Sequence, residues 1–95
     1  MNTPYTAEQL AEGTIRRGIL RLTDRFPFHA KVLEQFQLAA SDLVGTIGVR
    51  APPSGVLLLH NPAFVLSLPV EQLDGVLLHE VLHVVFGHIT IDRAR

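Results

Sequence analysis

One stretch near the C-terminal end determines the architecture of this chain: Val76-Leu77-Leu78-His79-Glu80-Val81-Leu82-His83-Val84-Val85-Phe86. In this stretch and in the residues just before it, apolar residues recur at the spacing of a helix. This pattern predicts a helix over about residues 70–86 with Pro69 at its first turn. Apolar side chains lie on nearly every side of this expected helix. We therefore expect it to be central and buried in the fold.

The same stretch contains the pattern H-E-x-x-H at His79-Glu80-Val81-Leu82-His83. Two histidines four residues apart lie about 40° apart around a helix axis, so both imidazoles can reach one cation. Glu80 lies at the rim of that face, where its carboxylate can act as the general base on a metal-activated water. The alternative is a set of buried polar groups that hydrogen-bond to one another. Unpaired ionisable groups on an apolar helix are costly and bound Zn²⁺ supplies the compensating charge, so we predict a zinc site.

A third zinc ligand is needed, because catalytic zinc usually takes three protein ligands. His88 is the first candidate, since the helix can end at Gly87 and the chain can then turn His88 back toward the other imidazoles. Asp92 is an alternative that is otherwise an ordinary surface carboxylate, and His60 is an alternative that is otherwise a polar group at a strand end. His29 is the weakest candidate. A thiolate ligand is excluded because the chain has no cysteine.

The rest of the chain predicts helices and a small sheet. Thr6 and Gln9 have the spacing of a capping box, and Pro27 interrupts the helical pattern that follows. Proline and glycine between residues 51 and 55 indicate a turn. The expected elements are helices over about residues 7–25 and 28–40 and a hairpin-like pair of strands over Val44–Arg50 and Val56–His60. The predicted class is α+β: N-terminal helices, a short two-stranded hairpin or small sheet, and the buried helix, in one domain over residues 1–95.

Composition excludes several partners. Eight basic and nine acidic residues give a net charge of -1, so we expect neither nucleic acid nor an anionic membrane surface as a partner. The ionisable residues of the C-terminal helix argue against a membrane span. Residues 1–9 lack the features of a secretory signal, and a cytoplasmic location is the expectation.

Four stretches of the chain carry a family resemblance: Asp24–Phe28, Gly45–Val49, Leu58–Val65 and Val76–His88. They resemble the metal-dependent peptidases whose zincin-like N-terminal domain is often followed by a von Willebrand A-like domain. The resemblance covers about residues 10–90. It implies a zincin-like fold, with His79, His83 and His88 as metal ligands and Glu80 as the catalytic acid/base. It also implies an AAA+ ATPase of the MoxR type or a von Willebrand A-like protein as partner, and a chain that is a fragment or a minimal version of a longer protein.

The expected function is zinc-dependent hydrolysis of peptide bonds in a peptide or protein substrate. We expect the substrate to pair with the exposed edge of Val56–His60. No tyrosine lies near the motif, so Arg93 or zinc alone would stabilise the oxyanion. One alternative is a non-catalytic zincin-like interaction module, suggested by the short chain. The other is a zinc hydrolase acting on a non-peptide substrate, because zinc-hydroxide chemistry is generic.

Overall fold

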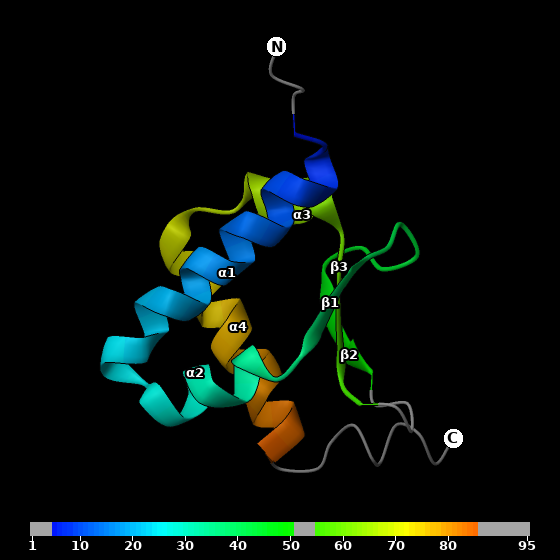
Figure 1. The fold of residues 1–95 in the computed structure, drawn as a ribbon. Coiled ribbons are helices and arrows are strands. Elements are labelled where there is room, and N and C mark those ends of the chain that lie inside the picture. Colours follow the sequence, from blue (N-terminus) through cyan, green and yellow to red (C-terminus); the bar gives the residue numbers. More distant parts are fainter. Residues whose placement is uncertain (1–4, 51–54, 86–95) are drawn as a thin grey trace.

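The computed structural model of the chain describes residues 5–50 and 55–85, which form helices and one sheet (Figure 1). Their order is α1 (Ala7–Arg25), α2 (Pro27–Glu34), β1 (Gln37–Ala40), β2 (Ile47–Arg50), β3 (Leu57–His60), α3 (Pro62–Ser67) and α4 (Val70–Val85). The predicted α+β class is confirmed.

Helix α1 begins and ends where the sequence predicts. The Thr6 hydroxyl accepts a hydrogen bond of 3.1 Å from the Gln9 backbone N–H, and the Gln9 side-chain oxygen accepts one of 2.9 Å from the Thr6 backbone N–H. This reciprocal pair satisfies donors that a helix start otherwise leaves unpaired. One face of α1 is buried in the core through Ala11, Ile15, Gly18, Ile19 and Leu22.

The predicted second helix over residues 28–40 is wrong in its second half. Helix α2 ends at Glu34, and Gln37–Ala40 forms strand β1, parallel to β3. The Gln37 N–H donates to the Val56 carbonyl and the Ser41 N–H to the His60 carbonyl, each at 2.9 Å. Leucine and alanine in this segment favour a helix, but pairing with a distant strand outweighs that weak local preference.

The sheet has the order β1-β3-β2. Strand β2 pairs antiparallel with β3, which confirms the expected hairpin-like pair. However, β3 lies between two partners, so the expectation that residues 56–60 offer an exposed edge is wrong. Within residues 5–50 and 55–85, β1 and β2 are the edge strands.

The helices gather on one side of the sheet (Figure 1). Leu58 and His60 alternate with less buried neighbours and face this side, and Ile47 pairs with His60 across the strands. Helix α3, which the sequence analysis did not anticipate, follows β3 directly. The Asn61 side-chain oxygen accepts a hydrogen bond of 3.1 Å from the Phe64 N–H, and Pro62 occupies the first turn.

Helix α4 contacts α1, α2 and β2, so it is central as predicted. It is not buried on all sides. Leu73, Leu77 and Val81, here called the buried stripe, are at most 1% exposed, whereas Leu82 is 38% and Val85 is 46% exposed. The apolar composition of the outward side therefore misled the prediction of complete burial. No helix within the described ranges is long and apolar enough to cross a membrane.

Candidate metal centre

A second line of residues runs along α4 beside the buried stripe. At about 100° per residue, four side chains fall on one face of the helix, and we call them the open stripe: Gln72, Val76, His79 and His83. Gln72 and His79 are exposed, while Val76 and His83 are half-buried. Because the buried stripe is fixed in the core, it sets the rotation of α4 and holds the two histidines on the accessible side.

The two histidines of the motif converge. Their Nε2 atoms are 2.9 Å apart, and their rings are perpendicular with centroids 4.5 Å apart. Ligand atoms of His79, Glu80 and His83 all lie within 4.8 Å of one another. Two imidazole nitrogens on a tetrahedral Zn²⁺ lie about 3.3 Å apart, from Zn–N bonds of about 2.0–2.1 Å. The observed Nε2–Nε2 distance differs from this value by only a few tenths of an ångström, so the residues fit a metal ion.

Glu80 lies between the open and buried stripes and is half-buried. Burial raises the pKa of its carboxyl group, and the positive charges of His83 and His79, when protonated, oppose that rise. A carboxylate with a raised pKa holds a proton more readily, which suits a general base.

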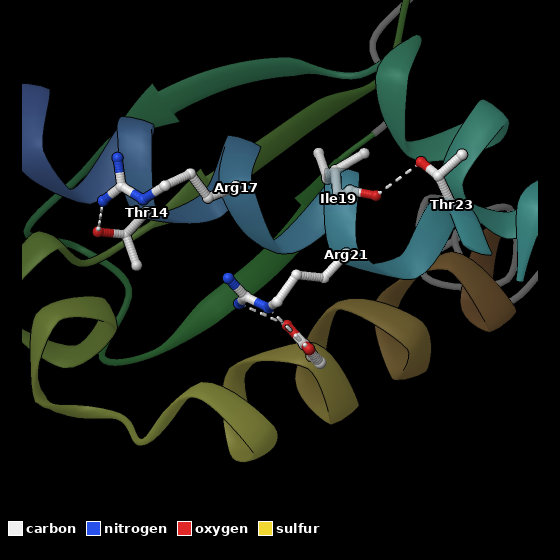
Figure 2. Close-up of polar contacts among 6 residues, drawn as sticks. Thr14, Arg17, Ile19, Arg21 and Thr23 are labelled. Carbon is white, nitrogen blue, oxygen red and sulfur yellow. Dashed lines mark hydrogen bonds and ion pairs between the residues drawn. The ribbon is translucent and has the colours of Figure 1, made fainter. Parts of the chain in front are cut away.

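Helix α4 is tied to α1 ahead of the histidines. The Arg21 guanidinium donates two hydrogen bonds to the Asp74 carboxylate, of 2.8 and 3.1 Å, which reach from α1 to α4 (Figure 2). Gly18 allows the close approach of the two helices, because a Cβ at this position would lie 3.0 Å from Leu77 Cδ1 and 3.2 Å from Asp74 Oδ1. The helix that bears the motif is therefore held at a defined position by its first half.

The structure does not bring the other described histidines to this group. His60 is fully buried, and among the residues that the structure describes neither of its ring nitrogens has a hydrogen-bond partner. Burial lowers the pKa of His60, and the carboxylates of Glu12 and Glu8 on α1 oppose that effect. His29 packs edge-on against the rings of Phe26 and Phe28. The remaining predicted residues, His88, Asp92 and Arg93, lie outside the described residues.

A hollow of about 510 Å³, which we call the side pocket, adjoins the motif. Its lining comes from three elements and the residue before β2: Thr46, Ile47, Phe64, Gln72, Gly75, Val76, His79 and Glu80. The sequence alone does not predict this pocket. The Asn-Pro signal for α3, which positions Phe64, was the one local clue to it.

Comparison with known proteins agrees with the chemistry of the group. Residues 12–95 match the model of a family described as "Putative metallopeptidase domain". An uncharacterized protein of Thermotoga maritima is 30% identical over 81 residues, which are 84% of this chain and 20% of that protein. The chain thus spans about one fifth of the length of this relative. No solved structure matches.

Proposed function

Because the chain belongs to this family of metallopeptidase domains, we propose that it hydrolyses peptide bonds with the help of a zinc ion. The observation that carries the proposal is the pair of Nε2 atoms 2.9 Å apart on α4, beside a half-buried carboxylate. Imidazole nitrogens are donors that suit Zn²⁺, and a carboxylate beside them can act as a base.

In this proposal His79 and His83 hold the ion, and His88 supplies the third ligand, with Asp92 as the alternative. A zinc ion bound there would make a water molecule acidic near neutral pH and would polarise the scissile carbonyl. Glu80 would act as the general base, accepting a proton from the attacking water and returning it to the leaving amine. Its position beside both imidazoles and its burial support this role.

The substrate would bind at strand β2 rather than β3. Strand β2 is an edge strand that contacts α4. Its first residue, Ile47, lines the side pocket together with His79 and Glu80. A peptide hydrogen-bonded to this edge would have its backbone close to the proposed metal centre, and backbone pairing makes few demands on sequence.

The proposal is tested with zinc-loaded protein and casein as substrate. Glu80→Gln keeps the size of the side chain but removes the base, so it should lower the rate by about 10²- to 10⁴-fold. Glu71→Gln makes the same change at an exposed position of the same helix and should hydrolyse casein like the wild type.

Each other outcome has a defined meaning. If Glu80→Gln retains full activity, Glu80 is not the base. If the wild-type chain binds zinc but cleaves no peptide, the proposal of a peptidase fails. The alternatives are then a non-catalytic interaction module or a zinc hydrolase with a non-peptide substrate.

A further inference from the structure

We propose that the side pocket binds an uncharged apolar side chain of the substrate, next to the bond that is cleaved. The inference rests on the proposed function, since it assigns the substrate class of the same site. It would make the enzyme selective for peptides with a leucine-like or phenylalanine-like residue at that position.

The place of the pocket on α4 supports this assignment. Gln72, Val76 and His79 follow one another along the open stripe, so the pocket extends from the motif toward the start of the helix. His79 and Glu80 themselves line the pocket, and so does Ile47 of the edge strand β2. A peptide paired with β2, with its carbonyl at the motif, therefore has a neighbouring side chain at the pocket.

The chemistry of the lining selects the kind of side chain. Ile47, Phe64 and Val76 come from three different elements and give the pocket an apolar wall. Among residues 5–50 and 55–85, the lining has no ionisable group apart from the motif residues His79 and Glu80. An apolar side chain gains free energy from contact with this wall, whereas an acidic side chain does not and is repelled by the Glu80 carboxylate. A volume of about 510 Å³ is ample for an aromatic ring, given that cavities of about 150 Å³ bind benzene.

Gly75 is one of the residues that line this pocket. A Cβ at this position would meet no atom of the described residues within 4 Å, so a larger side chain fits there without displacing them. Glycine inside a helix costs about 1 kcal/mol relative to alanine. The position thus offers a way to narrow the pocket while strengthening the helix.

Binding can be measured without metal and without hydrolysis. The probes are blocked hexapeptides of alanine that carry leucine, alanine or aspartate at one central position, titrated into the whole 95-residue chain and followed by amide chemical shifts. We expect the leucine peptide to bind at least about tenfold more tightly than the alanine peptide, and the aspartate peptide to bind most weakly. The shifted amides should include Thr46, Gly75 and Val76.

Gly75→Leu should reduce the preference for leucine over alanine to about one, because the new side chain occupies part of the pocket. Gly13→Leu, the same change on α1 where a Cβ would touch only the Arg17 side chain at 3.4 Å, should keep the wild-type preference. Equal affinities for the three peptides, no detectable binding, or shifts confined to other residues would overturn the proposal.

Cleavage is scored separately, by mass spectrometry of products from an unfolded protein treated with zinc-loaded chain. Apolar residues should be enriched at one position beside the cleaved bond. Leucine-selective binding without any cleavage would contradict the peptidase function and leave the pocket assignment intact. Cleavage without side-chain preference, together with unselective binding, would contradict the pocket assignment alone.

Discussion

Two stripes of α4, about a third of a turn apart around the helix axis, differ in what covers them. Leu73, Leu77 and Val81 of the buried stripe are at most 1% exposed and join the core with α1 and the sheet. In the open stripe His79 is exposed and His83 half-buried, and the side pocket is lined by Gln72, Val76 and His79 of this stripe. Side chains of one helix thus form part of the hydrophobic core and also include the proposed metal ligands. The two stripes should respond to mutation in different ways.

The largest expected effect on the buried stripe comes from Leu77→Ala. This leucine is fully buried, so its truncation should lower the free energy of unfolding by about 2–5 kcal/mol. Leu82→Ala removes the same atoms from a side chain that is 38% exposed and should cost less than about 1 kcal/mol. Urea denaturation measures both. Similar losses for the two variants would show that the buried stripe is no better covered than the outward side of α4 on which Leu82 lies.

Gly18→Val tests how closely α1 packs against the buried stripe of α4. A Cβ at this position would press on Leu77 Cδ1 and on the Asp74 carboxylate, so we expect a loss of about 1–3 kcal/mol in unfolding free energy. Gly13→Val, in the same helix with only the flexible Arg17 side chain nearby, should change stability by less than about 0.5 kcal/mol. If Gly18→Val is as stable as Gly13→Val, the two helices are not held as closely as described.

The stability of the protein in acid tests the state of His60, the histidine in the core. Burial lowers the pKa of His60, so below its ordinary pKa of about 6.5 the unfolded chain takes up the proton more readily. His60 should therefore lower stability as the pH falls from 7 through 6.5, by at most about 1.4 kcal/mol per pH unit.

His60→Leu removes a buried side chain whose ring nitrogens have no partner within residues 5–50 and 55–85, and it should remove this part of the acid sensitivity. The measurement is the difference in unfolding free energy between wild type and variant from pH 7 to pH 5. A difference that stays constant over this range would contradict the assignment of His60 as a buried neutral imidazole.

The smallest expected effect comes from the ion pair that ties α1 to the first half of α4. Arg21 and Asp74 have side chains 37% and 23% exposed, so solvent screens their attraction. A double-mutant cycle with Arg21→Ala and Asp74→Ala should give a coupling energy of about 0.5–1 kcal/mol in thermal or urea unfolding. A coupling energy near zero would show that the ion pair does not help to position α4 and that the packing at Gly18 does so without it.

Local signals explain what the sequence could predict. The capping box at Thr6 and the periodic apolar residues located α1, and the H-E-x-x-H spacing placed His79, Glu80 and His83 on one helix. These features depend on residues a few positions apart, and the structure brings the three motif side chains together as that spacing implies.

Contacts between distant segments explain what the sequence could not predict. Strand β1 exists because Gln37–Ala40 pairs with β3, twenty residues further along the chain, while its own residues favour a helix. The side pocket combines Ile47 and Phe64 with α4, and no pattern in any one segment indicates such a combination. Leu82 is hydrophobic, so the sequence predicts that it lies in the core, but in the structure it faces outward. Hydrophobicity alone does not determine which side of a helix is covered by other elements.

The central claim is that the open stripe of α4 binds a zinc ion through its histidines. Elemental analysis and thermal unfolding of the 95-residue chain after zinc loading test it most directly. We predict about one zinc ion per chain for the wild type and for His29→Ala, with zinc at 100 times its dissociation constant adding about 2.7 kcal/mol of stability. His79→Ala should lose both the zinc and the stabilisation. Equal zinc content in His79→Ala and the wild type, or no zinc in the wild type, would contradict the claim.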